Sequence, residues 1–250
     1  MEVFFITGAS RGIGRALAKE LLHENTILVC TARSKSDELM ALAEEKGSHL
    51  AFIEYDLAQT GELENLMDSM ISYVPKYPES VTLINNAGVI DPIGNTEDNS
   101  AGEIERSIAV NLIAPMILTS AFIDRLKDKH VPKRVINVSS GAGRHAYAGW
   151  SSYCAGKAGL DHYSRAVSLE QKREPHGVKV VSVAPGIIDT DMQKRIRSTE
   201  RENFELVDQF KGYKEKGLLS SPEETAKSLV QLMKREDFAS MDVVLDLRNL

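Results

Sequence analysis

A glycine-rich segment between the first apolar run and the first helical pattern constrains the fold of this chain more than any other feature. The run Val3–Thr7 is rich in aromatic and β-branched residues, and Gly8, Gly12 and Gly14 follow it with the spacing Gly-x-x-x-Gly-x-Gly. A glycine turn between a strand and a helix lets a phosphate approach the backbone, and the helix N-terminus offers it unpaired N–H groups. No Gly-Lys-Ser or Gly-Lys-Thr follows, so a P-loop is excluded. The segment therefore predicts a phosphate-binding turn in an α/β fold.

Short apolar runs alternate with stretches of helical spacing along the chain. The predicted strands are Val3–Thr7, Thr26–Ala32, His49–Tyr55, Val81–Asn85, Arg134–Ser139, Val178–Ala184 and Asp242–Leu247. Between them, apolar residues recur at helical intervals, as in Ile13, Leu17, Leu21 and Leu22, in Leu63, Leu66, Met67 and Met70, and in Ile104, Ile108, Leu112 and Met116. The alternation predicts an α/β, single-domain Rossmann fold over residues 1–250. Its core would be a doubly wound parallel β-sheet of about seven strands with helices on both faces.

Charge and cysteine content narrow the functional classes. The 250 residues carry 30 Lys and Arg against 36 Asp and Glu, a formal net charge of −6, which argues against a nucleic-acid-binding surface. Cys30 and Cys154 form no Cys-x-x-Cys motif, so no metal site is expected. No apolar run reaches the roughly 20 residues of a membrane span, and the first residues do not resemble a signal peptide. We expect a cytoplasmic protein with no nucleic-acid or membrane partner.

The stretch Ile187–Ser221 differs from the rest of the chain. It is rich in charge and contains no predicted strand, and its apolar residues recur at roughly helical intervals: Met192, Ile196, Phe204, Val207, Phe210 and Leu218. A long insertion in a compact domain is usually a lid or a binding loop. We expect a substrate lid at about residues 187–221, with an ordinary pair of surface helices as the alternative.

Two arginines bear on which nucleotide the turn would accept. Arg33 and Ser34 follow the second predicted strand, where an NAD-selective site carries an acidic residue that binds the ribose 2′-hydroxyl. An arginine suits a 2′-phosphate instead, and Arg11 in the glycine turn could reach the same group. NADP(H) is therefore expected, with two solvated arginines as the alternative. Asp56, after the third predicted strand, could accept from an adenine amino group.

Tyr153 and Lys157 stand four residues apart, which places them on one face of a helix. Because a nearby ammonium favours the phenolate, Lys157 is expected to lower the pKa of Tyr153 toward the working range of an acid–base group. Ser140, just after a predicted strand, offers a hydroxyl that could hold a carbonyl oxygen beside the tyrosine. Ser151 or Ser152 is expected to cap the helix. The alternative is an ordinary helix face with a surface lysine.

In their order and spacing, these motifs resemble those of the short-chain dehydrogenase/reductase family over essentially the whole chain. The turn Thr7–Gly14, the Asn-Asn-Ala-Gly motif at residues 85–88 and the pair Pro185-Gly186 all resemble family patterns. The resemblance implies the catalytic residues Asn111, Ser140, Tyr153 and Lys157. It also implies an NADP(H) site made of Gly8, Ser10, Arg11, Gly12, Ile13, Gly14, Arg33, Ser34, Asp56, Leu57, Asn86, Ala87, Gly88, Tyr153, Lys157, Pro185, Gly186, Ile188, Thr190 and Met192.

The reaction that the resemblance implies is hydride transfer to a ketone. Tyr153 would donate a proton to the developing alkoxide, and Ser140 would hydrogen-bond the same oxygen. Lys157 would bind the nicotinamide ribose, Asn111 would hold a water for proton resupply, and Thr190 would bind the carboxamide.

Local segments resemble one subgroup of the family. Those around Tyr153 and at residues 184–193 resemble sepiapterin reductases, and those around Trp150 and at residues 82–88 resemble bacterial benzil reductases. The resemblance implies NADPH-dependent reduction of a small aromatic or vicinal dicarbonyl compound, such as a benzil-like 1,2-diketone or a pterin side chain. The substrate residues would be Ser140, Trp150, Tyr153 and Asp246. An apolar pocket wall is expected from Tyr147, Trp150, Met192, Phe204 and Phe210.

Other activities stay open at this stage. They are an NAD-linked alcohol dehydrogenase, a regulator that senses NADP(H), and a methyltransferase that would leave Ser140, Tyr153 and Lys157 unexplained. Family members commonly pair through helices that here would be Ala101–Leu126 and Ser151–Gln171, so a homodimer or a tetramer is expected.

Overall fold

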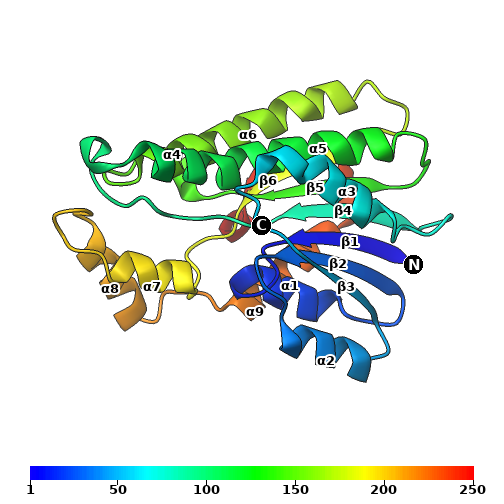
Figure 1. Ribbon diagram of the computed structural model, residues 1–250, viewed down its shortest axis with the longest axis horizontal. Helices are drawn as coiled ribbons and strands as arrows, with labels where there is room; N and C mark the ends of the chain where they lie inside the picture. Colours follow the sequence, from blue (N-terminus) through cyan, green and yellow to red (C-terminus); the bar gives the residue numbers. More distant parts are fainter.

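The computed structural model describes residues 1–250 and has a seven-stranded parallel sheet at its centre (Figure 1). The strands are β1 (Glu2–Thr7), β2 (Thr26–Ala32), β3 (His49–Glu54), β4 (Ser80–Asn85), β5 (Lys133–Val138), β6 (Lys179–Ala184) and β7 (Val244–Asp246). Their order in the sheet is β3-β2-β1-β4-β5-β6-β7. The predicted strands are all present, with ends shifted by at most two residues. Because the strand order reverses between β1 and β4, the carboxyl ends of these two strands form the usual ligand-binding crevice of such folds.

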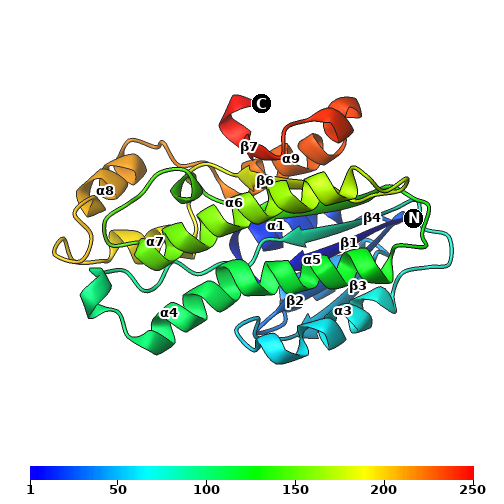
Figure 2. The same cartoon turned by 90° about the horizontal axis from the view of Figure 1, so that it is seen from above.

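Helices cover both faces of the sheet (Figure 2). One face carries α1 (Gly12–Leu21), α2 (Asp37–Glu45) and α9 (Pro222–Met233), and the other carries α3 (Leu63–Ile71), α4 (Ala101–Ile108), α5 (Ala114–Arg125) and α6 (Ser151–Gln171). Each layer has its own apolar core, which includes Leu17, Leu39 and Leu229 on the first face and Met67, Leu118 and Phe122 on the second. The doubly wound single domain predicted from the alternation of runs is confirmed.

Side-chain caps mark the starts of three helices that cover the sheet. Ser36, Ser100 and Ser221 accept from backbone N–H groups at the starts of α2, α4 and α9. Such caps stabilise helix ends by about 1 kcal/mol each. At α6 the expectation was wrong, because the residue before the helix is Trp150 and no side chain caps its first turn. Ser151 and Ser152 lie inside the helix, because α6 begins directly after the buried Trp150.

One predicted apolar stripe does not face the sheet. The buried residues of α4, the π-helical turn Ala109–Ile113 and α5 include Ser107, Asn111 and Leu118. Ile104, Ile108 and Leu112 are only partly buried, and Met116 is exposed. The helical stretch Ala101–Arg125 is long and apolar enough to cross a membrane, but 56% of its most apolar window is buried against the protein, as in a core helix.

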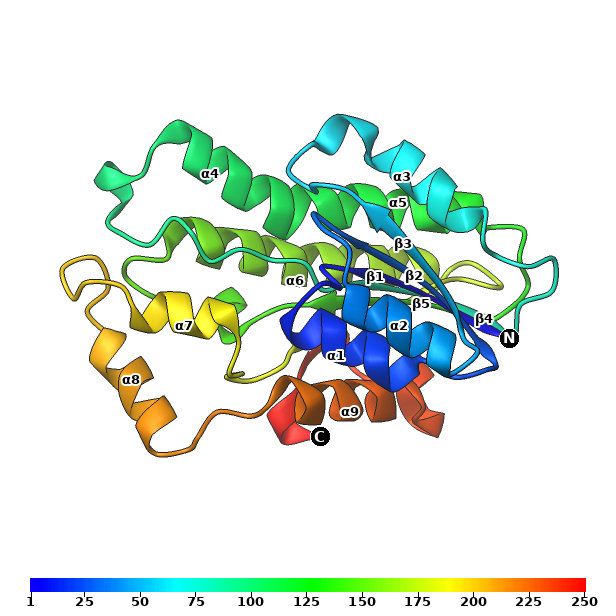
Figure 3. The same ribbon diagram turned by 60° about the horizontal axis from the view of Figure 1, so that its bottom comes forward.

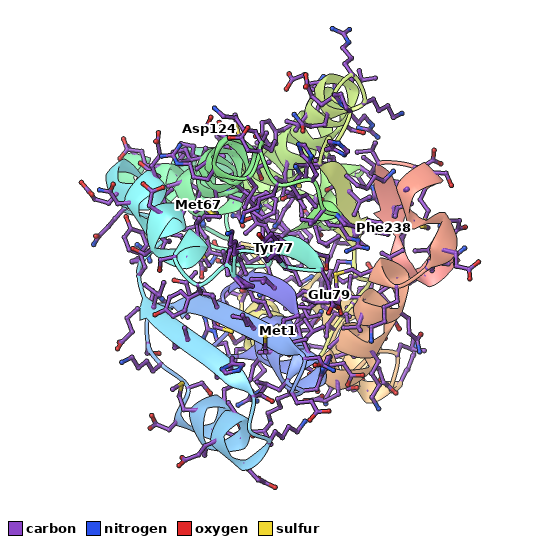
Figure 4. The ribbon with its side chains drawn as sticks, turned by 90° about the vertical axis from the view of Figure 1, so that its right-hand side faces the viewer. Met1, Met67, Tyr77, Glu79, Asp124 and Phe238 are labelled. Atoms are coloured by element: carbon purple, nitrogen blue, oxygen red, sulfur yellow. The ribbon has the colours of Figure 1, made fainter.

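The segment predicted as a lid forms two short helices, α7 (Asp191–Arg197) and α8 (Val207–Glu215), at the carboxyl end of the sheet (Figure 3). A bridge between Ile188 and Ser220 closes the base of the segment. The opposite face carries the amino ends of the strands and the chain N-terminus (Figure 4). There the amino group of Met1 lies 2.8 Å from the Glu79 carboxylate. The helices of the insertion therefore stand at the ligand-binding edge of the fold, away from the N-terminus.

Candidate active site

A cavity of about 630 Å³ opens at the carboxyl ends of the strands and extends beneath α7 and α8. The predicted cofactor residues that line it are Gly8, Ser10, Arg11, Gly12, Ile13, Arg33, Asp56, Leu57, Asn86, Ala87, Gly88, Tyr153, Lys157, Pro185, Gly186, Ile188, Thr190 and Met192. Ser140 and Trp150 line it as well, whereas Gly14, Ser34, Asn111 and Asp246 do not. One cavity thus brings together most of the predicted site residues, which come from seven separate segments of the chain.

The glycine turn is shaped to receive a phosphate. Gly8 and Gly12 have φ values of 68° and 54°, a region that side chains disfavour. No side chain caps α1, so its first N–H groups stay open toward the cavity. Gly14 has a packing role, because a Cβ there would collide with the Gly8 carbonyl oxygen and the Asn86 amide. An open helix N-terminus next to bare backbone fits the pyrophosphate of a dinucleotide.

Asn86 holds this turn in place from the neighbouring strand. Its side-chain amide donates to the carbonyl oxygens of Thr7, at 2.9 Å, and Gly8, at 3.3 Å. The Thr7 hydroxyl in turn accepts from the N–H groups of Asn86 and Ala87. The Asn-Asn-Ala-Gly motif therefore fixes the shape of the phosphate turn.

The other asparagine of this motif begins a buried polar network. Asn85 donates to Asn137 of β5 at 2.8 Å and to Thr119 of α5 at 3.2 Å. Asn137 donates to Ser164 of α6 at 2.9 Å, and Ser164 donates to the Leu160 carbonyl. These buried bonds tie β4, β5 and α6 together, so the residues that follow β5 keep a fixed position relative to α6.

Arg33 and Asp56 lie at the end of the cavity near β2 and β3, where Arg106 of α4 joins them. The Arg106 guanidinium lies 3.0 Å from the Asp56 carboxylate. Burial would raise the pKa of Asp56, but the Ala58 N–H and the Arg106 guanidinium outweigh it and hold the pKa below its usual range. Arg106 was not predicted from the sequence, because only the three-dimensional path of α4 brings it near the end of β3.

Tyr153 and Lys157 lie on the inward face of α6, both almost fully buried. The Lys157 ammonium donates to the Val138 carbonyl at 2.8 Å and lies 5.8 Å from the centre of the Tyr153 ring. Burial lowers the pKa of Lys157 to about 8, against the opposing charge of Asp161. Ser140 follows β5, and its hydroxyl accepts from the Ala142 N–H.

The lowering of the Tyr153 pKa that we expected from Lys157 does not outweigh the effect of burial in this structure. Burial raises the pKa of Tyr153, and the nearby Ser140 hydroxyl opposes it only in part. The ammonium points to the Val138 carbonyl, so its field does not offset the loss of water around the phenol. Tyr153 consequently keeps its proton at neutral pH.

Asn111 lies behind the cavity in the π-helical turn between α4 and α5. Its side-chain oxygen accepts from the Val89 N–H at 3.1 Å, and its amide donates to the Val89 carbonyl at 2.8 Å. The amide also donates to the Ser107 hydroxyl at 3.3 Å, so the side chain joins the loop after β4 to α4.

An aromatic cluster forms the wall of the cavity next to Tyr153. Trp150 stacks on Phe204 with ring centres 4.5 Å apart and meets Tyr153 edge-on at 6.0 Å. Phe210 of α8 packs edge-on against both Trp150 and Phe204. Four of the five residues predicted for the wall line the cavity, namely Tyr147, Trp150, Met192 and Phe210 of α8. Phe204 does not line it and packs against Trp150 instead.

Asp246 and Arg144 occupy positions behind the cavity. Asp246 does not reach the cavity, because its carboxylate binds Arg248, which does line the cavity. Arg144 exposes 25% of its side chain and lies 3.4 Å from the buried Asp161. Arg248 was not predicted from the sequence. Its position could have been predicted, because it is a polar residue just after the last parallel strand, and such residues lie at the ligand-binding edge of the sheet.

A family model described as short chain dehydrogenase matches residues 2–201. The chain is 40% identical to a Bacillus cereus benzil reductase that forms (S)-benzoin, and the alignment covers 98% of both chains. It is 34% identical to mouse sepiapterin reductase, over 95% of this chain and 94% of that protein. A short chain dehydrogenase/reductase structure from Saccharomyces cerevisiae superposes with a TM-score of 0.83 at 26% identity, over 99% of this chain and 96% of that one.

Proposed function

The chain belongs to the short chain dehydrogenase family, and from this premise we propose that it is an NADPH-dependent reductase of vicinal diketones that carry an aromatic ring. Its family and relatives make it an oxidoreductase that acts on carbonyl or hydroxyl groups. The observation that carries the narrower proposal is the aromatic wall, in which Trp150 packs against Tyr153 inside the cavity. A planar substrate ring on this wall would bring an attached ketone next to the phenol.

The residues around the glycine turn would hold the dinucleotide. The open N-terminus of α1 and the backbone of Gly8 and Gly12 fit its pyrophosphate, and Lys157 would bind the nicotinamide ribose. The nicotinamide, when bound, supplies the hydride that ketone reduction needs. The preference for NADPH follows from Arg33, whose exposed guanidinium lines the cavity after β2 and suits a 2′-phosphate better than a hydroxyl.

Tyr153 would donate the proton that the reduced ketone requires. Its buried phenol keeps its proton at neutral pH, which is the form needed for donation. Ser140 would donate a hydrogen bond to the same substrate oxygen, stabilising the charge that develops there. The Lys157 ammonium would stabilise the phenolate left after donation, because an opposite charge nearby favours the ionised form.

Oxidation of NADPH, followed by its absorbance, tests the proposal. Benzil, 1-phenyl-1,2-propanedione, diacetyl and sepiapterin are compared at equal concentration, with NADH as the control cofactor. We expect the two aryl diketones to react fastest and NADPH to be preferred. Diacetyl as the best substrate would contradict the role of the aromatic wall. Binding of NADPH without turnover of any ketone would favour a protein that senses the dinucleotide.

We also propose that the chain forms a homodimer in the cytoplasm through α4, α5 and α6. The outer face of these helices leaves Ile113, Met116 and Leu169 exposed. Apolar side chains gathered on one face favour a protein contact. Light scattering that gives the mass of a single chain at micromolar concentration would contradict the dimer.

A further inference from the structure

The last turn of the chain brings a positive charge to the rim of the cavity. Beyond β7, the short helix Leu247–Asn249 carries Arg248, whose side chain lines the cavity. It passes over Gly186, where an added Cβ would lie 3.4 Å from the arginine Cδ. Tyr147 and Tyr213 line the same cavity, and the Asp246 carboxylate raises the pKa of Arg248. Arg248 thus stands between the loop after β6, the loop after β5 and helix α8.

A chain of polar contacts fixes the position of Arg248. The Asp246 carboxylate accepts from Arg248 Nε at 2.9 Å and from Arg248 Nη2 at 2.6 Å. Arg144 lies 3.8 Å from Asp246 and donates to the Leu245 carbonyl at 2.7 Å. Arg144 also lies 3.4 Å from the buried Asp161, which accepts a hydrogen bond from Ser182 of β6 at 2.6 Å. The last turn is therefore connected to α6 and β6, which flank the catalytic residues.

The charges in this cluster cancel. Arg144 and Arg248 face Asp161 and Asp246, two positive against two negative groups. Arg248 uses Nε and Nη2 on Asp246, and its Nη1 makes no hydrogen bond, so that nitrogen remains free to donate. A free donor in a neutral cluster favours an uncharged acceptor. A carboxylate would lose hydration free energy on binding, and a cluster without net charge would not compensate for that loss.

The cavity is accordingly two-sided. Trp150 and Phe210 make one side of the cavity apolar, with the rings of Tyr147 and Tyr213 packed against them, whereas Arg248 adds a charged, polar side at the rim. A substrate that matches both sides has an aromatic ring and a neutral oxygen beside the ketone that reacts.

On the basis of the proposed function, we propose that Arg248 binds the second carbonyl oxygen of the diketone and so selects vicinal dicarbonyls over simple ketones. The side chain is 62% exposed, so its hydrogen bond is weakened by water. Its removal should cost about tenfold in selectivity, at the lower end for a charged donor.

The test compares two ketones that share a phenyl group. 1-Phenyl-1,2-propanedione has the second carbonyl oxygen, and 2,2,2-trifluoroacetophenone is an activated ketone without it. We expect Arg248→Ala to lower kcat/KM for the dione about tenfold more than for the trifluoroketone. Asp246→Asn, which leaves the arginine but loosens it, should give a ratio between those of wild type and Arg248→Ala.

Arg235 provides a matched control. It binds Asp237 through Nε and Nη2, both at 2.8 Å, in the same two-pronged manner, and it does not line the cavity. Arg235→Ala should therefore leave the ratio of the two kcat/KM values within about twofold of wild type, as expected for a surface ion pair.

Three results would overturn the inference. An equal fall for both ketones in Arg248→Ala would show that Arg248 does not read the second oxygen. A larger fall for phenylglyoxylate, an anionic analogue, than for the dione would assign Arg248 to a carboxylate. Failure of the wild-type protein to reduce either ketone would overturn the proposed function and this inference with it, whereas the first two results leave the proposed function standing.

Discussion

The residues around Tyr153 and the insertion that follows Gly186 are held in place by different forces. Around Tyr153, buried hydrogen bonds link Asn85, Asn137 and Ser164 across two strands and a helix. In the insertion, the polar contacts are mostly exposed ion pairs, such as Lys214 with Asp189 at 2.6 Å. Buried networks are strong because a broken bond leaves a polar group without water, whereas exposed pairs contribute about 1 kcal/mol or less.

This difference separates chemistry from substrate choice. The proposed proton donor lies on the part of the fold that cannot move without losing buried hydrogen bonds. The aromatic wall and the polar rim depend on α8 and the last turn, whose polar contacts reach the surface. Substitutions in the first region should therefore remove turnover or stability, and those in the second should change which ketone is preferred.

The largest effect is expected for Tyr153→Phe, which removes the proposed proton donor and keeps the ring. Since a positioned general acid contributes roughly 10²- to 10⁴-fold, we expect kcat to fall about 10³-fold. NADPH binding, measured by its fluorescence, should change by less than about twofold, because the ring that packs against Trp150 remains. Turnover close to that of wild type would show that another group gives the proton.

Asn137→Ala tests the buried side of the comparison. It removes partners of both Asn85 and Ser164 in a site without solvent access. We expect the free energy of unfolding in urea to fall by about 2–4 kcal/mol. Ser69→Ala is a suitable control, since its hydroxyl donates to a backbone carbonyl on the exposed side of α3. Similar losses in the two variants would mean that the network adds no special stability.

The same division explains what the sequence allowed us to predict. The strands and the glycine turn follow from local patterns, and the positions of Tyr153 and Lys157 follow from helical spacing. The inward side of the helix formed by α4 and α5 could not be predicted in this way, because its apolar stripe at Ile104 and Ile108 lies partly on the surface. Arg106 reaches the cavity only through long-range packing, so no local pattern assigned it, whereas the position of Arg248 just after the last strand was a signal that could have been used.

Arg33→Ala tests the dinucleotide end of the cavity. Only NADPH carries the 2′-phosphate, so loss of a charged donor should raise its KM about tenfold and change that of NADH little. Lys35→Ala is the matched control, because Lys35 lies two residues further on and near Glu54, outside the cavity. Equal changes in the two KM values would remove Arg33 from the 2′-phosphate site.

The pKa of Lys157 predicts how turnover depends on pH. Because burial lowers this pKa to about 8, the ammonium predominates below that pH and is lost above it. We expect kcat/KM for NADPH to be level below pH about 8 and to fall as the pH rises further. Asp161→Asn removes a charge that raises the pKa of Lys157, so the fall should begin at lower pH. An unchanged profile would show that Lys157 does not control it.

The smallest effect is expected in the insertion. Asp189 accepts from Lys214 of α8 at 2.6 Å and from Arg197 of α7 at 3.4 Å, so it joins both helices. Asp189→Asn should lower the free energy of unfolding by less than about 1 kcal/mol, because Lys214 is exposed and the contact with Arg197 is long and only partly buried. It should still raise KM for the diketone a few-fold, since α8 carries Phe210 and Tyr213 at the cavity. Asp208, whose longer pairs stay outside the cavity, gives the control Asp208→Asn. A loss of stability comparable to that of Asn137→Ala would erase the contrast between the two regions, because exposed pairs would then hold the fold as firmly as the buried network does.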